Sequence, residues 1–175
     1  MSMADDGVAV VPMSVRRCRP EELDGAFAVW LAANEARGRF PSTARRARVR
    51  AKLADSEAFS IVAVDQGSVV GMALGEPGRL ADGEGPRDFS LLHVSMAFVD
   101  PARWGTGVGR ALLDELFAEA RRAGYLRAAL WTASDNERAR RLYVGSGMHP
   151  TGRRKTLASY GAVIQFGVEL GDDVR

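Results

Sequence analysis

One stretch of the sequence, RWGTGVGR at residues 103–110, constrains the fold more than any other. It follows an apolar run at 91–99 and leads into a helical pattern that begins at Val108. Backbone N–H groups in the first turn of a helix have no internal partner, and the helix dipole is positive there. Glycines allow a ligand to approach that backbone without meeting a Cβ atom. The stretch therefore predicts a strand-to-helix turn that can bind phosphate or pyrophosphate.

Two common phosphate-binding patterns do not fit this turn. A Walker A loop has Lys and then Ser or Thr after its last glycine, whereas Arg110 and Ala111 follow Gly109 here. A dinucleotide fingerprint has the spacing Gly-x-Gly-x-x-Gly early in a βαβ unit. In this chain Gly105, Gly107 and Gly109 alternate, and they lie past its middle. Glycines that only form a tight turn remain the alternative interpretation.

The rest of the chain predicts strands and helices without an internal repeat. Apolar, β-rich runs predict strands at 13–19, 59–65, 69–74, 91–99 and 126–132, and two short strands near 148–153 and 160–170. Amphipathic patterns predict helices at 20–36 and 43–53, one from Val108 that stops at Gly124, and one behind a capping-box pattern at 134–137 that closes at Gly147. Residues 75–88 are expected to form a polar loop.

Composition excludes several classes of protein. The single cysteine, Cys18, allows no intrachain disulfide, and two histidines with one cysteine do not make a usual zinc site. No apolar run reaches the roughly 18 residues of a membrane helix. Asp5 and Asp6 lie where a signal peptide would be basic. We expect a cytoplasmic protein with no metal and no membrane association, built as a flexible tail at 1–12 and a single domain at 13–170.

The predicted helix at 43–53 is dense in positive charge. It carries Arg45, Arg46, Arg48, Arg50 and Lys52. A solvated basic face is the simpler interpretation, and a surface that steers an anionic substrate is the alternative. The run lacks interleaved aromatic residues and the net charge of the chain is only +2, so we expect no nucleic-acid partner.

Residues 91–148 resemble the GNAT superfamily of N-acetyltransferases. The matching blocks are LLHVSMAFVDPARWGTGVGRALLDELFAEARRAGY and LWTASDNERARRLYVGSGM. The resemblance implies an α/β (α+β) fold with a mixed, mostly antiparallel central sheet of about six to seven strands and about four flanking helices. It also implies acetyl-CoA as co-substrate and no metal. Trp104 stands where the family usually has Gln or Arg.

The resemblance also implies which residues bind the co-substrate. The end of the strand at 91–99 would bond the pantetheine arm like an added strand, through Ala97, Phe98 and Val99. Backbone amides of the turn would hold the pyrophosphate, at Gly105, Thr106, Gly107, Val108, Gly109 and Arg110. Asn136 is a further expected contact.

Tyr143 is the candidate acid for acetyl transfer. The resemblance places it facing the CoA sulfur, and a phenol with a pKa of about 10 can donate a proton to the leaving thiolate. A tyrosine that only packs on the inner face of its helix is the alternative.

The general base is assigned by position in the family pattern. Some members carry a glutamate eleven residues before the Gln/Arg position, which is His93 here, and an imidazole with a pKa of about 6.5 suits a base. A satisfied core histidine is the alternative. Ser95 shares a strand face with His93 and can hold a water. Glu35, at the end of the first predicted helix, is a less favoured candidate for the base. Trp131 occupies the other position where family members carry a glutamate.

The acceptor is expected to be a primary amine of a small molecule or peptide, which attacks directly in a ternary complex. Polyamines or other amino compounds, antibiotic amines and peptide N-termini all fit the sequence. The alternative function is a non-catalytic acyl-CoA-binding regulatory module, against which the presence of both Tyr143 and His93 argues. A homodimer is an open alternative to a monomer.

Overall fold

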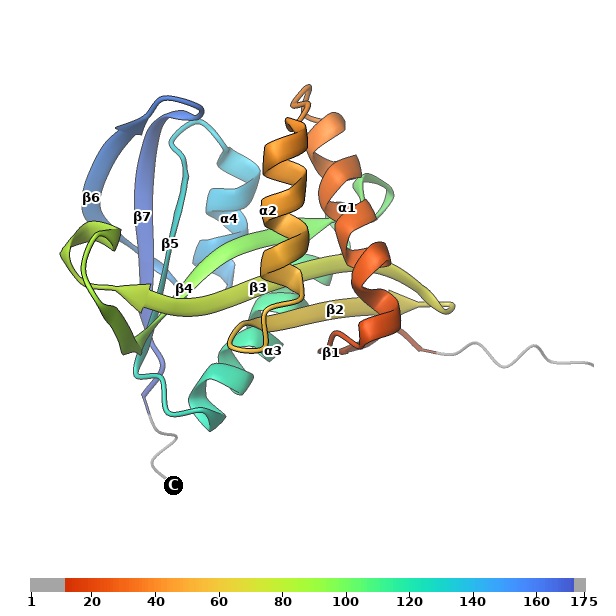
Figure 1. Ribbon diagram of the computed structural model, residues 1–175, viewed down its shortest axis with the longest axis horizontal. Coiled ribbons are helices and arrows are strands. Elements are labelled where there is room, and N and C mark those ends of the chain that lie inside the picture. The colour runs from red at the N-terminus through yellow and green to blue at the C-terminus, as the bar shows by residue number, and fades with distance from the viewer. Residues whose placement is uncertain (1–11, 172–175) are drawn as a thin grey trace, which may run out of the picture.

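The computed structural model describes residues 12–171 and places their strands in one sheet, in the order β1-β2-β3-β4-β5-β7-β6 (Figure 1). The strands are β1 (Ser14–Arg17), β2 (Phe59–Asp65), β3 (Ser68–Arg79), β4 (Arg87–Val99), β5 (Arg127–Ala133), β6 (His149–Leu157) and β7 (Gly161–Glu169). The helices are α1 (Leu23–Glu35), α2 (Thr43–Leu53), α3 (Val108–Arg122) and α4 (Glu137–Gly145). Short 3-10 turns are at Pro20–Glu22, Ala81–Gly83 and Pro101–Arg103. The predicted fold class is confirmed.

The sheet is antiparallel except for one strand pair. β4 and β5 run parallel, and α3 makes the crossover between them. All other neighbouring strands are antiparallel. The sheet therefore consists of two antiparallel parts, β1–β4 and β5–β7–β6, which meet at the β4–β5 pair.

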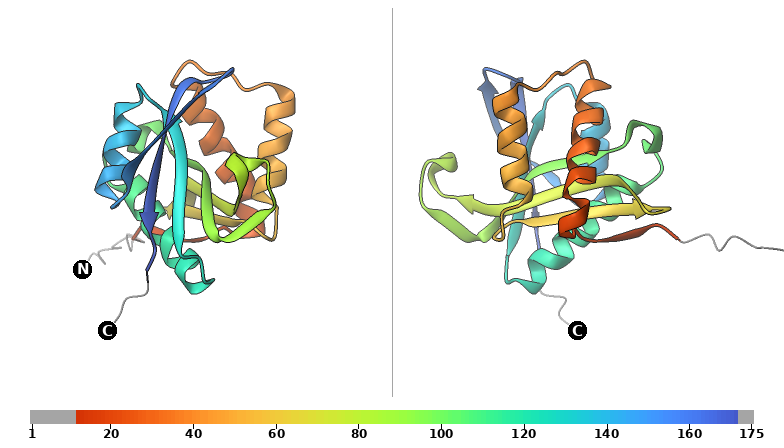
Figure 2. Two further views of the ribbon diagram at one scale, coloured as in Figure 1. Left: turned by 90° about the vertical axis from the view of Figure 1, so that its left-hand side faces the viewer. Right: turned by 45° about the vertical axis from the view of Figure 1, so that its right-hand side comes forward.

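Helices cover both faces of the sheet (Figure 2). α1 and α2 lie on one face, and α3 and α4 lie on the other (Figure 1). The α3 face buries the apolar stripe that periodicity predicts, namely Val108, Leu112, Leu113, Leu116, Phe117 and Ala120. On the α1 face, Phe27 and Trp30 are buried with their rings 5.4 Å apart. Each face of the sheet thus packs against its own pair of helices.

The polar loop predicted at 75–88 is wrong. β3 continues to Arg79 and β4 begins at Arg87, so only 80–86 connect them. Proline and glycine led to the loop prediction, but Pro77 and Gly78 lie at a register shift, where proline is tolerated. A Cβ on Gly78 would lie 2.7 Å from Cγ of Leu91, which explains the glycine as a close strand contact.

The capping box predicted at 134–137 is wrong, because α4 begins two residues later than that pattern requires and has a simple N-cap. Asn136, not Ser134, is the N-cap of α4, and its side-chain oxygen accepts from the backbone N–H of Ala139 at 3.3 Å. The predicted helix stops are confirmed, because Gly124 and Gly147 have φ values of +89° and +84° beyond α3 and α4.

The predicted tail at 1–12 lies almost wholly outside the described residues. Between residues 12 and 171, no helix is long and apolar enough to span a membrane. The same residues include no group of three or more His, Cys, Asp or Glu side chains arranged to hold a metal ion.

Candidate active site

The candidate site lies along the line where β4 and β5 meet and then separate, which we call the β4–β5 seam. Within the described chain the two strands pair only where residues 91–93 face residues 127–129, and beyond His93 the ladder ends. A cavity of about 1820 Å³ follows the seam and is lined by residues from both faces of the sheet. Tyr143, His93 and the glycine-rich turn all line it. The structure thus brings both predicted catalytic residues to one cavity.

A β-bulge in β4 lies at this seam. Leu92 and Val94 belong to the core on the α3 face, but Met96 belongs to the core on the α1 face. Strict alternation would keep all three on one face, so β4 holds one extra residue at Ser95. The register of β4 against β3 shifts at the same place. The sequence pattern missed this bulge, because a continuous apolar run does not reveal a change of face.

The end of β4 forms an open strand edge. Ala97, Phe98 and Val99 are partly buried and line the cavity. No pairing with β5 is recorded for this part of the described sheet. Peptide groups on such an edge can bond the amides of an extended ligand, so the edge fits a pantetheine arm in the way the resemblance implies.

The glycine-rich turn joins η3 (Pro101–Arg103) to α3. Gly105 and Gly107 have φ values of +76° and +88°, a conformation that favours glycine. Gly107 is the N-cap of α3 and gives no side-chain cap, so the first amides of the helix are left for a ligand. Gly109 has a different role, since a Cβ there would lie 3.0 Å from Leu142 of α4. The tight-turn interpretation and the phosphate-site interpretation are therefore compatible.

Trp104 connects the turn to its surroundings. Its indole Nε1 donates to the carbonyl oxygen of Val99 at 2.9 Å. The guanidinium of Arg138 lies 3.5 Å from the centre of a Trp104 ring, in a cation–π contact. The Val99 carbonyl oxygen on the β4 edge thus accepts one hydrogen bond and keeps a second lone pair. Asn136 lines the cavity beside this region, but its side-chain oxygen is engaged in capping α4.

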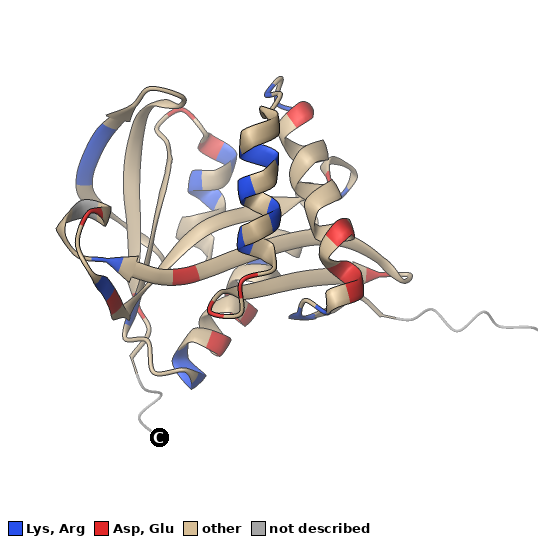
Figure 3. Ribbon diagram, viewed as in Figure 1, with Lys and Arg blue, Asp and Glu red and all other residues tan. Residues whose placement is uncertain are grey.

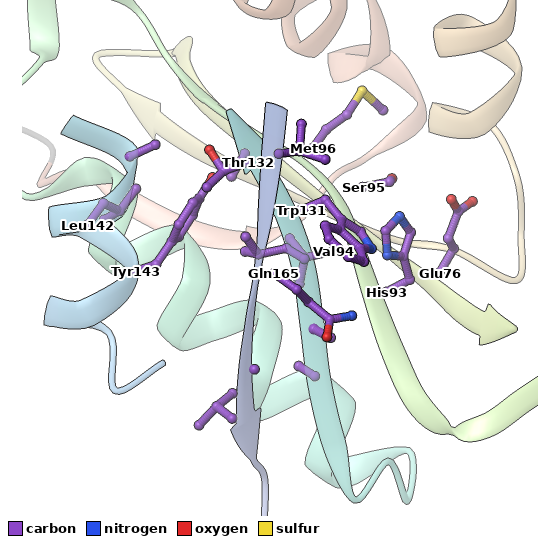
Figure 4. Close-up of a pocket in the computed structure, with 18 of the residues that line it drawn as sticks. Glu76, His93, Val94, Ser95, Met96, Trp131, Thr132, Leu142, Tyr143 and Gln165 are labelled. Atoms are coloured by element: carbon purple, nitrogen blue, oxygen red, sulfur yellow. The ribbon is translucent and has the colours of Figure 1, made fainter. Parts of the chain in front are cut away.

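Tyr143 lies on the α4 side of β5 (Figure 4). Its ring is buried, 5.7 Å from the ring of Phe166, and its hydroxyl hydrogen-bonds with the side chain of Thr132. Burial raises the pKa of Tyr143 to about 12. The phenol is therefore protonated at any physiological pH and available as a hydrogen-bond donor. Packing and cavity lining are both observed, so the two interpretations of this tyrosine do not exclude each other.

His93 lies on the opposite side of the sheet, with Glu76 (Figure 4). The two residues face each other across the β3–β4 ladder. Glu76 also forms a salt bridge of 2.5 Å with Lys52 of α2. Burial lowers the pKa of the His93 imidazole, and the nearby Glu76 charge partly opposes that shift. His93 is thus neutral near pH 7, which is the form that accepts a proton.

The two other residues considered for proton removal, Ser95 and Glu35, differ in their position relative to the cavity. Ser95 lines the cavity, and among the described side chains its Oγ is one of two buried polar atoms without a hydrogen-bond partner. A buried hydroxyl in this state favours a ligand or water at that position. Glu35 is exposed at the end of α1 and is not among the described residues that line the cavity.

Sequence reasoning missed several residues of the cavity. Glu76 lies in the segment predicted as a loop, and its place opposite His93 follows from strand register. Lys52 is visible in the sequence only as part of a basic run. Lys155 and Gln165 come from β6 and β7, and both line the cavity with Trp131. No local pattern could have grouped residues from strands so far apart in the chain.

Comparisons with known proteins agree with this geometry. The family model described as the Acetyltransferase (GNAT) family matches residues 26–148, which is more than half of the chain. The chain belongs to this family, whose members are N-acetyltransferases that use acetyl-CoA, and the resemblance inferred from the sequence is confirmed. Comparison with curated protein sequences gives no significant match.

Solved structures show the same fold at low identity. The ribosomal-protein-S18-alanine N-acetyltransferase of Escherichia coli is 16% identical with a TM-score of 0.72, over 94% of this chain and 99% of its own. A GNAT family acetyltransferase from Brucella melitensis in complex with acetyl-CoA is 22% identical with a TM-score of 0.68, over 94% and 92%. Aminoglycoside 6'-acetyltransferase type Ii is 17% identical with a TM-score of 0.71, over 91% and 98%.

Proposed function

We propose that this protein transfers the acetyl group of acetyl-CoA to a primary amine by direct attack in a ternary complex. One observation carries the proposal. A single cavity runs through the β4–β5 seam, with the uncapped N-terminus of α3 at one end and with Tyr143 and His93 on opposite sides of the sheet. Such a cavity allows a donor and an acceptor to approach each other from the two faces.

The donor is assigned to the α3 side. Backbone amides of the turn from Gly105 to Arg110 hold the pyrophosphate, and the helix dipole favours its charge. Among them, the Thr106 N–H also donates to the Arg103 carbonyl oxygen at 3.3 Å. The open edge of β4 holds the pantetheine arm. Ala97 and Val99 are the edge residues proposed for this contact, and the Val99 carbonyl oxygen also accepts from the indole of Trp104. Asn136 contributes at the start of α4, through the part of its side chain that does not cap the helix.

The acceptor amine is assigned to the His93 side. An alkylamine has a pKa of about 10 and must lose a proton before it attacks. A neutral imidazole accepts that proton, directly or through a water at the Ser95 hydroxyl. The neutral amine attacks the thioester carbonyl, which forms the C–N bond and a tetrahedral oxyanion that peptide N–H groups at the β4 bulge can stabilise. When this intermediate collapses, the C–S bond breaks, the sulfur leaves as a thiolate, and the second proton of the attacking nitrogen passes to solvent.

Tyr143 acts on the leaving sulfur. Its pKa of about 12 lies well above the roughly 8.5 of a cysteine thiol, so complete proton transfer to the thiolate is unfavourable. Tyr143 therefore stabilises the thiolate by donating a hydrogen bond, rather than by transferring its proton as expected from the sequence. Charge-assisted hydrogen bonds of this kind are about twice as strong as neutral ones.

A non-catalytic acyl-CoA-binding module is the competing function. Both functions predict that acetyl-CoA binds and raises the melting temperature, so binding alone does not separate them. Thiol release from acetyl-CoA in the presence of amines does. We expect release that depends on both the enzyme and an amine. A protein that is stabilised by acetyl-CoA but releases no thiol with a broad amine panel would be the module instead.

A further inference from the structure

The acceptor side of the cavity has a wall of three strands. Trp131 of β5 pairs with Gln165 of β7, and Val163 of β7 pairs with Lys155 of β6. Paired residues project from the same face of a sheet, and so do residues two apart in one strand. Lys155, Gln165 and Trp131 therefore share the face opposite Phe166, which packs in the core with Tyr143.

Positive charge is held against this wall. The Lys155 ammonium lies 4.2 Å from the centre of a Trp131 ring, and the Arg153 guanidinium lies 5.7 Å from it. Both side chains line the cavity. Arg45 of α2 adds a third cation, since it lines the same cavity and hydrogen-bonds with the hydroxyl of Tyr160 in the β6–β7 turn. Figure 3 shows basic residues along both α2 and β6.

The described residues that line the cavity carry more positive than negative charge. Among the described residues that line the cavity, twelve are Arg or Lys and five are Asp or Glu. Three of the five carboxylates, on Glu57, Glu76 and Asp88, already form salt bridges with Arg or Lys. No salt bridge within residues 12–171 includes Lys155. Cations near the turn suit the phosphates of CoA, but Lys155 lies on the other face.

We infer that the acceptor is an amine that also carries an anionic group, a carboxylate or a phosphate, and that Lys155 binds this group with help from Arg153. The amine then lies toward His93, away from the wall of cations. The inference rests on the proposed acetyl transfer and narrows its substrate class. It disfavours polycationic acceptors, because several ammonium groups would meet Arg and Lys in a partly dehydrated cavity.

Arg154 provides a matched control. It lies between Arg153 and Lys155 on β6, but adjacent residues of a strand point to opposite faces, and Arg154 is not among the described residues that line the cavity. Lys155→Gln and Arg154→Gln remove the same charge from neighbouring positions. If Lys155 binds the anionic group directly, Lys155→Gln should weaken binding of the anionic amine and Arg154→Gln should have little effect. A general field from the basic surface would make the two variants alike.

The test is calorimetric binding of amines to the protein saturated with CoA, which requires no turnover. The probes are matched pairs: β-alanine with β-alaninamide, 4-aminobutyrate with 4-aminobutanamide, and 2-aminoethyl phosphate with ethanolamine. Spermidine and kanamycin represent polycations. We expect the anionic member of at least one pair to bind about tenfold more tightly, and Lys155→Gln to remove that preference while Arg154→Gln keeps it. The carboxylate and phosphate pairs distinguish the two anions.

Several results would overturn the inference. These are equal or tighter binding of the neutral members, tighter binding of the polycations, no binding by any anionic amine, or equal losses in the two variants. Thiol release with spermidine or kanamycin alone would retain acetyl transfer and reject the anionic acceptor. Absence of thiol release with every amine, together with preserved anion preference, would reject acetyl transfer only.

Discussion

The two sides of the β4–β5 seam are built in different ways. The donor side comes from one nearly continuous segment, from the end of β4 through the turn to Tyr143 of α4. The acceptor side collects single residues from β3, β4, β5, β6, β7 and α2. A contiguous site leaves a motif in the sequence, whereas a collected site depends on strand register. The difference explains why the donor is readable from the sequence and the acceptor becomes readable only in the fold.

The largest effect is expected on the donor side, at Gly107. Gly107→Ala forces a side chain into a φ of +88° at the N-cap of α3 and shifts the amides of the turn. We expect the dissociation constant of acetyl-CoA to rise about 100-fold, as for the loss of two charge-assisted hydrogen bonds. Isothermal titration calorimetry measures it.

Gly124→Ala is the matched control for that change. Gly124 has a φ of +89° beyond α3 and does not line the cavity in the described structure. Both variants should lose about 1 kcal/mol of stability, because alanine is strained at positive φ. Acetyl-CoA binding should be weakened only at Gly107. Equal affinities in the two variants would mean that the turn does not bind the donor.

The next largest effect is expected at Tyr143. Tyr143→Phe keeps the ring against Phe166 but removes the donor to the thiolate. We expect kcat to fall about 10- to 100-fold with little change in KM, since one hydrogen bond to a charged group is worth about 1.5–3 kcal/mol. Tyr125→Phe is the control, because Tyr125 is a buried core tyrosine packed on Phe59 outside the cavity. An unchanged kcat in Tyr143→Phe would remove this residue from the mechanism.

A smaller effect is expected on the acceptor side, in the pH dependence. Burial lowers the pKa of His93, so activity should be lost only as the pH falls below 6.5. Glu76 raises that pKa, and Glu76→Gln should therefore move the acidic limb of kcat/KM to still lower pH. Lys52, freed from its salt bridge, acts in the same direction.

Two variants make the pH profile decisive. His93→Gln should lose the limb together with most of the activity. Glu119→Gln, which changes a salt-bridged carboxylate on α3 outside the cavity, should leave the limb where it is. A limb that stays in place in both His93→Gln and Glu76→Gln would assign the titration to another group.

The smallest effect is expected at Trp104. Trp104→Gln introduces a residue that the family usually carries, frees the Val99 carbonyl and removes the contact with Arg138. We expect a stability loss of about 1–2 kcal/mol from the hydrogen bond and the cation–π contact. The dissociation constant of acetyl-CoA should change less than about fivefold. A larger loss of affinity would show that Trp104 contacts acetyl-CoA directly, rather than only stabilising the turn through Val99 and Arg138.

Local patterns in the sequence predicted much of the fold. The apolar stripe of α3, the glycines that end α3 and α4, and the turn before α3 all depend on neighbours within a few residues. Elements whose signal is local were therefore found in the right order. The hairpin formed by the ends of β3 and β4 was missed, because Pro77 and Gly78 resemble loop residues until their strand contacts are known.

On the acceptor side of the candidate site, the sequence predicted His93 and Ser95 but not the residues that surround them. The Ser95 bulge arises from pairing with β3, and the His93–Glu76 contact arises from register across the same ladder. The Lys155–Trp131 contact needs β6, β7 and β5 to be aligned together. The local sequence does not reveal how these strands align, so the residues that surround His93 and Ser95 on the acceptor side could not be predicted from it.

Hydrogen–deuterium exchange with and without acetyl-CoA tests the central claim most directly, because it locates the donor on the chain. Peptides that cover 95–99 and 105–111 should be protected by acetyl-CoA, since their free amides would bond the pantetheine arm and the pyrophosphate. Peptides from β1 and β2 should not change. Protection confined to other segments, or none at 95–99 and 105–111 under saturating acetyl-CoA, would contradict the account.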